Sequence, residues 1–220
     1  MSKDDWDFPP PASDQLKNAV LLTTGSMNPT HKGHVDMLRL AKLELEKDGW
    51  NVCAAFLSPS HDLYLRSKMM GFNFVPATQR ITMANLAVQN YPWLYISDWE
   101  SSQKGYWPDF TEVIDSLKQA ITDRGISAHT FYVCGSDHAR YCWDLNELVV
   151  IARAQQQGIS HTPHHHQYYI KATQNLYLTC SSTTVRKLLL TPNPQDQLSA
   201  KALLGVEVYT YIQDHKLYRP

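Results

Sequence analysis

Short apolar runs alternate with amphipathic helical patterns along most of this chain. Buried strands, in which apolar residues stand side by side, are predicted at 19–23, 51–57, 94–97, 129–135, 149–153 and 175–179. Helices, in which apolar residues recur at spacings of three and four, are predicted at 35–47, 77–90, 109–122, 182–190 and roughly 202–214. Strands that are apolar throughout and alternate with helices favour an α/β fold. We therefore expect a doubly wound parallel sheet with helices on both faces and further helices at the C-terminus.

The length and composition are those of a single globular domain. The chain has 220 residues, of which 43% are hydrophobic and 19% are charged, enough for one substantial core. Residues 1–16 are polar and rich in proline, and they predict a loosely held N-terminal arm. The remaining residues, 17–220, are expected to form one domain.

The charge balance and the apolar pattern limit the classes of partner. Lysine and arginine number 20 against 21 acidic residues, so the protein has no general field for holding a nucleic acid. No apolar stretch approaches the length of a bilayer span, and the N-terminus lacks the apolar centre of a signal peptide. The cysteines, Cys53, Cys134, Cys142 and Cys180, form no CxxC pair and are predicted to be reduced core thiols. We expect a cytoplasmic or nuclear protein without membrane contact, and a homo-oligomer is left open.

The segment GSMNPTHKGH, residues 25–34, directly follows the first predicted strand and leads into a helix. Gly25 allows a tight turn close to a ligand, and the first N–H groups of the helix lack intrahelical partners. His31 and His34 are three apart, so both rings can face one anion at this helix start. The simpler alternative is a capped helix with two surface histidines. A zinc pair is a weaker alternative, because no HExxH motif or carboxylate set completes it.

A second polar segment, SSTTVR, begins the helix that follows the last predicted strand. Serine or threonine at this position is a common N-cap, which is the simpler interpretation. Arg186 lies one turn inside the helix and can turn toward its N-terminus. Together with Ser182, Thr183 and the unpaired N–H groups, it predicts a second cradle for phosphate.

These two motifs resemble the (H/T)xGH and ISSTxxR signatures of the nucleotidyltransferase superfamily. Five further segments are similar, in matching order, to eukaryotic-type nicotinamide mononucleotide (NMN) adenylyltransferases: FLSPSHDLY, PATQRITMANLA with its inward arginine, SDWESSQ, YVCGSDH and VYTYIQDHKLY. The likeness spans roughly residues 19–217. It implies a Rossmann-like fold and an enzyme that transfers AMP from ATP to nicotinamide or nicotinate mononucleotide, giving a dinucleotide such as NAD and pyrophosphate.

The resemblance also implies roles for individual residues. His34 matches the catalytic histidine, and His31 and Arg186 are expected to assist it. The positions matched to ATP are Gly25, Ser26, His31, His34, Arg66, Lys68, Gly135, Asp137, Ser182, Thr183 and Arg186. Those matched to the mononucleotide are Ser26, Met27, Trp99 and Glu100, with Trp99 stacked on the pyridine ring. The cofactor implied is Mg²⁺ bridging the ATP phosphates, and the partners implied are ATP and a pyridine mononucleotide.

Some positions depart from the family pattern. Met27 stands where the family usually has phenylalanine, and Arg66, with Lys68 nearby, replaces a lysine. Trp143 is the nearest candidate for the second tryptophan beside the pyridine ring, at a different spacing. The choice between the amide and acid forms of the pyridine is left open.

Other aromatic and histidine residues receive structural interpretations. Trp93, Tyr95 and Trp107 are predicted to be packing residues, and PNPQDQ is predicted to be a turn. The histidine-rich stretch, His161–His166, is predicted to be a solvated loop, with transition-metal binding as the alternative.

Three other functions compete with NMN adenylyltransfer. One is a related nucleotidyltransferase or ATP hydrolase with a different phosphate acceptor. Another is a nucleotide-binding module that has lost catalysis. A class I aminoacyl-tRNA synthetase shares the HxGH logic, but this chain lacks a KMSKS-like loop and an anticodon domain.

Overall fold

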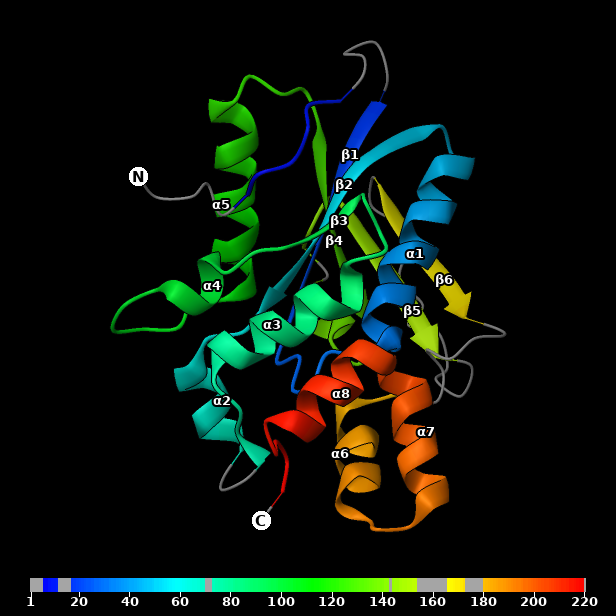
Figure 1. Cartoon of the computed structure of the whole chain (residues 1–220). Coiled ribbons are helices and arrows are strands. Elements are labelled where there is room, and N and C mark those ends of the chain that lie inside the picture. The colour runs from blue at the N-terminus through cyan, green and yellow to red at the C-terminus, as the bar shows by residue number, and fades with distance from the viewer. Residues whose placement is uncertain are drawn as a thin grey trace.

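The computed structural model describes residues 6–11, 17–69, 73–142, 144–153, 166–172 and 180–219 (Figure 1). Its sheet is six-stranded, entirely parallel and ordered β3-β2-β1-β4-β5-β6. The strands are β1 (Lys17–Gly25), β2 (Trp50–Pro59), β3 (Leu94–Ile96), β4 (His129–Gly135), β5 (Leu148–Arg153) and β6 (Gln167–Ala172). The predicted α/β fold with a parallel, Rossmann-like sheet is confirmed.

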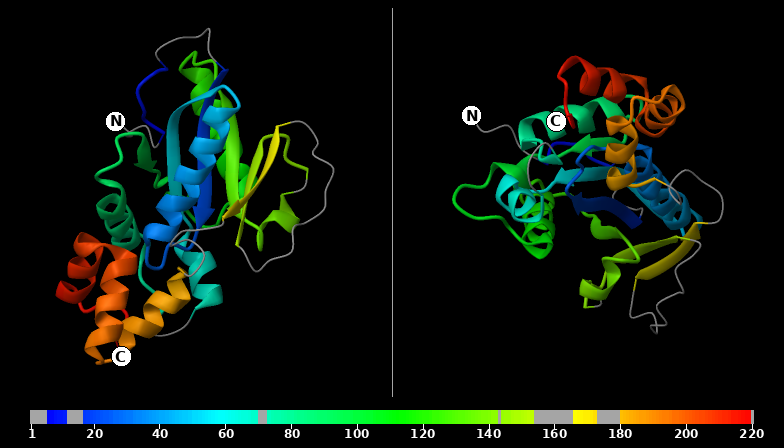
Figure 2. Two further views of the ribbon diagram at one scale, coloured as in Figure 1. Left: turned by 90° about the vertical axis from the view of Figure 1, so that its right-hand side faces the viewer. Right: turned by 90° about the horizontal axis from the view of Figure 1, so that it is seen from below.

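The helices lie on both faces of this sheet and beyond its carboxyl edge. They are α1 (Lys32–Lys47), α2 (Asp62–Lys68), α3 (Ala77–Val88), α4 (Trp99–Ser102), α5 (Phe110–Asp123), α6 (Ser182–Leu190), α7 (Pro194–Leu204) and α8 (Val206–Asp214). Figure 1 shows α1 and α5 on opposite sides of the strands, and Figure 2 shows α6, α7 and α8 gathered beyond the strand ends. Among the described helices, none is both long and apolar enough to cross a bilayer.

Alternation along β1 explains how the sheet buries both faces. Ala19 and Leu21 belong to a cluster that includes the apolar side of α1, whereas Val20 and Leu22 pack with α5. Successive side chains of a strand point to opposite faces, so a strand covered on both sides is apolar through most of its length. A third cluster joins α3 to α6, α7 and α8 and fixes the C-terminal helices against α3.

The edge of the sheet differs from the sequence-based prediction. The strand predicted at 175–179 lies outside the described residues, and the structure has a strand, β6, at Gln167–Ala172. It pairs in parallel with β5, with Val149 opposite Tyr168. Tyr168 and Ile170 are half-buried, and Tyr169 and Lys171 are exposed. An edge strand with this alternation lacks the continuous apolar run that identified the inner strands.

The turn predicted at PNPQDQ is wrong, because this segment begins helix α7. The Asn193 side chain accepts a hydrogen bond from the backbone N–H of Gln195 at 2.8 Å, and Pro194 occupies the first turn of the helix. Asparagine before proline is as suitable for a helix N-terminus as for a turn. The single helix predicted at 202–214 is instead α7 and α8, separated by Gly205 with φ of +90°.

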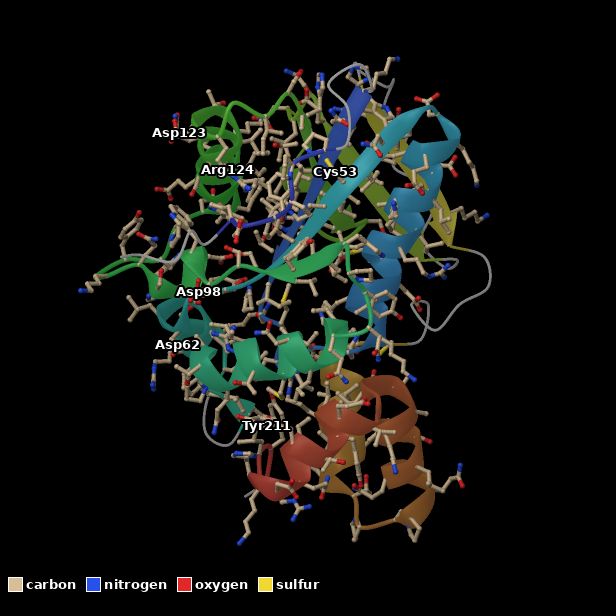
Figure 3. The ribbon with its side chains drawn as sticks, turned by 45° about the horizontal axis from the view of Figure 1, so that its top comes forward. Cys53, Asp62, Asp98, Asp123, Arg124 and Tyr211 are labelled. Carbon is tan, nitrogen blue, oxygen red and sulfur yellow. The ribbon has the colours of Figure 1, made fainter. Side chains whose placement is uncertain are left out.

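The described part of the predicted N-terminal arm, residues 6–11, is packed more closely than its composition suggests. Trp6 and Phe8 are buried against Phe56, and the Trp6 indole N–H donates to Ser116 at 3.0 Å. Arg124, labelled in Figure 3, donates to the carbonyl oxygens of Trp6 and Phe8 at 3.0 and 2.5 Å. Two aromatic side chains thus anchor a segment that is polar on average.

Candidate active site

A pocket of about 640 Å³ lies at the carboxyl ends of β1 and β4. The end of β1, the start of α1, the turn after β4 and the start of α6 all contribute to its wall. This is the edge at which parallel α/β sheets place their ligands, next to helix N-termini that are able to bind anions. The pocket therefore collects the polar segments that the sequence singles out.

The β1–α1 junction brings the two predicted histidines into contact. The backbone N–H of His31 donates to Nδ1 of His34 at 3.2 Å, and the His34 N–H donates to the His31 carbonyl at 2.9 Å. The rings are stacked with centroids 3.8 Å apart. Because Nδ1 of His34 accepts this hydrogen bond, a neutral His34 carries its proton on Nε2. Both histidines line the pocket.

Gly33 provides the space that this stack needs. A Cβ atom at residue 33 would lie 3.0 Å from Cε1 and Nδ1 of His31 and 3.2 Å from Cβ of Cys180. Real Cβ atoms rarely approach so closely, so a larger residue would displace the His31 ring. The glycine between the histidines thus positions the first of them.

The start of α6 meets the β1–α1 junction directly. The Ser182 hydroxyl donates to the carbonyl of Pro29 at 3.0 Å, and the Arg186 guanidinium donates to the carbonyl of Asn28 at 2.6 Å. Ser181 caps α6 by accepting the N–H of Thr184 at 3.1 Å. The convergence of the two strand-to-helix junctions, on which the sequence-based account depends, is confirmed.

The Arg186 side chain is committed to the protein rather than to the pocket wall. One guanidinium nitrogen binds Asn28, and another donates to the Thr183 hydroxyl at 3.3 Å. Burial lowers the pKa of Arg186 from its usual value. In this arrangement the arginine ties α6 to the turn after β1.

Asn28 also connects the turn to the C-terminal tail. The Tyr218 hydroxyl donates to Oδ1 of Asn28 at 2.7 Å, and Asn28 Nδ2 donates to the carbonyl of Asn73 at 2.6 Å. The Tyr218 side chain is buried beside α8. A residue near the end of the chain thereby holds the turn between β1 and α1.

The inward arginine implied by the resemblance is Arg80, which is fully buried. Its guanidinium donates to the carbonyl of Ser26 at 2.8 Å and to that of Ser60 at 2.6 Å. It also pairs at 2.8 Å with Asp62, which is labelled in Figure 3. Arg80 thus joins the loops after β1 and β2, and Ser26 and Ser60 of these loops line the pocket.

The other predicted site residues fall into two groups. Those that line the pocket are Gly25, Ser26, His31, His34, Lys68, Glu100, Gly135, Asp137 and Ser182. Those outside its wall are Met27, Arg66, Trp99, Thr183 and Arg186. Met27 is buried in the core cluster beside α1, Arg66 lies over the ring of Phe74 at 4.0 Å, and Trp99 is half-buried against the α5 side of the core.

Trp143, His161, His164 and His165 lie outside the described residues. His166 is described, and its ring meets that of Trp50 edge-on at 5.0 Å. Trp50 begins β2, so this histidine belongs to the amino edge of the sheet, opposite the pocket. No group of metal-ligating side chains occurs in the part of the chain that the structure describes.

One wall of the pocket is aromatic, and the sequence pattern does not predict it. It is formed by Trp107 and Phe110 before and in α5 and by Tyr132 and His138 around the end of β4. The Phe110 ring lies 5.2 Å from that of Tyr132 and 5.1 Å from that of His138. Hydrogen bonding of the His138 side chain with Cys142 raises the pKa of the histidine. Trp107, predicted to be a core or surface packing residue, is half exposed and lines the pocket.

Glu100 is a buried carboxyl group in the wall of the pocket. Desolvation raises the pKa of its side chain from 4.5 to about 7, although hydrogen bonds from Ser58 and Ser60 oppose the shift. The carboxyl group therefore prefers to be neutral in the folded protein, whereas it ionises in the unfolded chain near its ordinary pKa.

This shift predicts a pH dependence of stability. A raised pKa in the folded state means that the contribution is fully present below pH 4.5 and is lost as the pH rises to about 7. Glu100→Gln cannot ionise, so between pH 4.5 and 8 the wild-type unfolding free energy should fall by up to about 3 kcal/mol more than that of the variant. Urea unfolding at several pH values measures this difference, and parallel curves for the two proteins would contradict the buried carboxylic acid.

Comparison with known proteins identifies relatives of the whole arrangement. The family model described as Cytidylyltransferase-like matches residues 22–188, which include both junctions. A nicotinamide/nicotinic acid mononucleotide adenylyltransferase of Oryza sativa subsp. japonica is 27% identical over 227 residues, covering 91% of this chain and 86% of the relative. The Arabidopsis thaliana protein of the same name is 32% identical over 54% of this chain, and this chain covers 49% of it, about half its length.

Solved structures agree on the fold. Nicotinic acid mononucleotide adenylyltransferase of Plasmodium falciparum, in complexes with NaAD and with APC, superposes with a TM-score of 0.64 at 16% identity. Each match covers 92% of this chain and 97% of the solved one. The family model spans most of this chain, including both junctions and most strands of the sheet. This chain therefore belongs to the cytidylyltransferase-like family.

Proposed function

We propose that this chain is an adenylyltransferase that transfers AMP from ATP to nicotinamide or nicotinate mononucleotide. The observation that carries the proposal is the meeting of the α1 and α6 N-termini in one pocket. Support also comes from the relatives, which are named nicotinamide/nicotinic acid mononucleotide adenylyltransferases. A solved structure of similar fold contains NaAD.

The phosphates of ATP belong at the two helix N-termini. His31, His34 and Ser182 line the pocket there, and the first N–H groups of α1 and α6 add partial positive charge. We assign the adenosine to the turn that contains Gly135 and Asp137. Lys68, which also faces the pocket, is suited to neutralise phosphate, with Arg66 next to it on α2.

The loop after β1 lies between the two substrates in this proposal. Gly25 and Ser26 line the pocket, and we place them between the phosphates of ATP and the mononucleotide, which would bind on the α5 side. Thr183 and Arg186 support the start of α6 through their own hydrogen bond. From the family resemblance, we expect the mononucleotide to contact Met27, Trp99 and Glu100.

The residues present are compatible with magnesium held chiefly by the substrate. Mg²⁺ takes oxygen ligands, keeps several waters and is commonly bound through substrate phosphates. Within the described ranges no acidic cluster forms a dedicated cage, so ATP oxygens and water would supply most ligands. The ion would neutralise the triphosphate.

The reaction requires positioning and charge stabilisation more than a strong base. The 5′-phosphate of the mononucleotide has a second pKa of about 6 and is largely dianionic near neutrality. One of its oxygens forms a bond to the α-phosphorus of ATP while the bond from that phosphorus to the bridging oxygen breaks. Pyrophosphate leaves with the electron pair. The Nε2–H group of His34 is suited to stabilise the charge that develops on the transferred phosphoryl group.

Product analysis tests the proposal. The protein is incubated with ATP, Mg²⁺ and either NMN or nicotinate mononucleotide, and the dinucleotide and pyrophosphate are separated by chromatography. We expect equimolar dinucleotide and pyrophosphate with at least one acceptor, and neither product when the acceptor is omitted. Inorganic phosphate or pyrophosphate release without dinucleotide would indicate a hydrolase. Nucleotide binding by calorimetry without any turnover would indicate an inactive module.

The proposal also includes the partners of the protein and its compartment in the cell. Small phosphate-bearing molecules rather than nucleic acid are the expected partners, because the net charge is −1 and the basic groups are local. We place the activity in the cytoplasm or nucleus and in one domain, residues 17–220.

A further inference from the structure

Two cysteine side chains meet where the turn after β4 folds back on the strand. Cys134 lies near the end of β4, and Cys142 follows a 3₁₀ helix at Ala139–Tyr141. The Cys142 N–H donates to the Ala139 carbonyl at 3.0 Å, which closes this helix. The chain thereby returns to β4, and the two thiols form a hydrogen bond with each other.

The pair lies between the apolar core and the pocket. Cys142 is fully buried and Cys134 is 4% exposed, and both belong to the cluster on the α5 side of the sheet. Cys134 nevertheless lines the pocket, next to Gly135 and Asp137 of the turn. A small molecule that enters the pocket therefore has access to one sulfur atom of the pair.

The contact between the two sulfur atoms makes the pair acidic. The hydrogen bond with Cys134 is the main cause that lowers the pKa of Cys142 from 9.0 to about 6, and a hydrogen bond with His138 adds to it. The same contact raises the pKa of Cys134. At neutral pH the pair thus carries one negative charge and one proton, which the two sulfur atoms share. A thiolate is the form of cysteine that attacks oxidants.

Cys53, labelled in Figure 3, shows the contrast with an ordinary thiol of this protein. It belongs to β2, and its thiol donates to the Ala19 carbonyl at 3.2 Å. Burial raises its pKa from 9.0, so this cysteine is a thiol at neutral pH. Its sulfur atom should therefore react slowly with an oxidant.

Oxidation is the chemistry that fits the pair. Metal binding is the other reaction open to two thiols beside a histidine, but no group of three His, Cys, Asp or Glu side chains among the described residues could hold a metal ion. Two sulfur atoms in contact form a disulfide readily once one of them is oxidised, because the second attacks the first without a large movement of the chain.

We propose that Cys134 and Cys142 are a redox-modification site in the pocket wall, at which a hydroperoxide converts the two thiols into a disulfide and weakens the binding of ATP. The effect on ATP rests on the proposed function, which assigns the adenosine to the turn between the two cysteines. A covalent bond holds the sulfur atoms closer together than a hydrogen bond does. The end of β4 and the 3₁₀ helix are therefore drawn together, and the turn with Gly135 and Asp137 changes shape.

The reaction balances with the hydroperoxide as the oxidant. The shared proton moves to Cys142, and the thiolate of Cys134 attacks the outer oxygen of the peroxide. An S–O bond forms while the O–O bond breaks, and the leaving oxygen keeps the electron pair and takes a proton from water. The sulfur of Cys142 then attacks the sulfenic acid on Cys134. The S–S bond forms, the S–O bond breaks, and hydroxide leaves and combines with the proton of Cys142 as water. The two thiols lose two electrons and the peroxide gains them.

Peptide mapping after exposure to hydrogen peroxide tests the modification itself. Trypsin cleaves after Arg140, which lies between the two cysteines, so Cys134 and Cys142 fall in separate peptides. The folded protein is treated with peroxide, its remaining thiols are blocked with iodoacetamide, and it is unfolded and digested. We expect the two peptides to be joined, with the sum of their masses less two hydrogen atoms, and dithiothreitol to separate them. Two blocked thiols, or sulfinic acid on Cys134 without a linked peptide, would overturn the inference.

Steady-state kinetics measure the consequence for ATP. A coupling between two sites typically changes affinity about 5- to 150-fold. We expect KM for ATP to rise by such a factor in the oxidised wild type, KM for the mononucleotide to stay within about twofold, and dithiothreitol to restore both. Cys142→Ser lacks the acidic thiol and should keep its KM for ATP through the same treatment. Cys53→Ser is the matched control and should respond like the wild type.

Mapping and kinetics together separate this site from the proposed function. If the linked peptides form but the reduced protein makes no dinucleotide, the modification site stands and the transfer activity is wrong; calorimetric ATP binding then measures the effect. If the reduced protein makes dinucleotide and peroxide links no peptides, the function stands and the site is wrong. Linked peptides with an unchanged affinity for ATP would overturn the proposed effect on the pocket.

Discussion

Replacing His34 by alanine should lower kcat by about 10²–10³-fold while changing the affinity for ATP much less. The reason is that the Nε2–H group of His34 is fixed by its neighbours: Nδ1 accepts the His31 N–H, and the two rings stack at 3.8 Å. A donor fixed in this way does not have to reorganise during the reaction. It can therefore stabilise the charge that develops only in the transition state. Initial-rate measurements together with calorimetric ATP binding separate the two effects.

Two further variants show whether the effect belongs to catalysis. His34→Asn keeps an oxygen that can accept the His31 N–H, so it preserves the helix start but lacks the reach of the imidazole. We expect it to be nearly as slow as His34→Ala. His215→Ala is the matched control, because the His215 ring stacks on Tyr211 with centroids 4.0 Å apart and lies outside the pocket. It should retain activity within about twofold. Recovery of turnover in His34→Asn would mean that His34 acts as a helix cap and not as a catalytic group.

The features of this molecule that the sequence predicts well are those set by neighbouring residues, namely the strands, the helices and the junctions between them. The β1–α1 and α6 junctions are visible as a glycine or serine cluster between an apolar run and a helical pattern, and the structure places both at one pocket. The inner strands are apolar through most of their length because both faces of the sheet are covered, and this continuous pattern predicts them. Helix α6 begins and ends at the predicted residues, 182 and 190.

The parts that escaped prediction depend on contacts between distant residues. The bond from Tyr218 to Asn28 joins positions separated by 190 residues, and nothing in either local pattern announces it. Exposure is likewise a property of the folded chain, so Trp107 could not be distinguished from a packing tryptophan such as Trp93. The edge strand β6 is only half-buried, and half-burial removes the continuous apolar signal.

Arg80 shows how such distant contacts support the site. Its guanidinium donates to the carbonyls of Ser26, Ser60 and Val75 and pairs with Asp62, at distances of 2.6 to 2.9 Å. The three carbonyls belong to segments after a strand or before a helix, and Asp62 is the first residue of α2. A planar fork with five donors can satisfy all of them at once, which a lysine cannot do.

Arg80→Met should therefore lower the free energy of unfolding by about 3–5 kcal/mol, because it leaves buried carbonyl oxygens and the Asp62 carboxylate without their partner. Arg39→Met is the matched control: Arg39 is also on a helix and pairs with Asp36 at 3.2 Å, but its side chain is 42% exposed, so the loss should stay below about 1 kcal/mol. Urea unfolding measures both. At a temperature where Arg80→Met is still folded, its turnover should also fall, since the Ser26 carbonyl is no longer held. An unfolding free energy within about 1 kcal/mol of the wild type would mean that the loops after β1 and β2 are supported by other contacts.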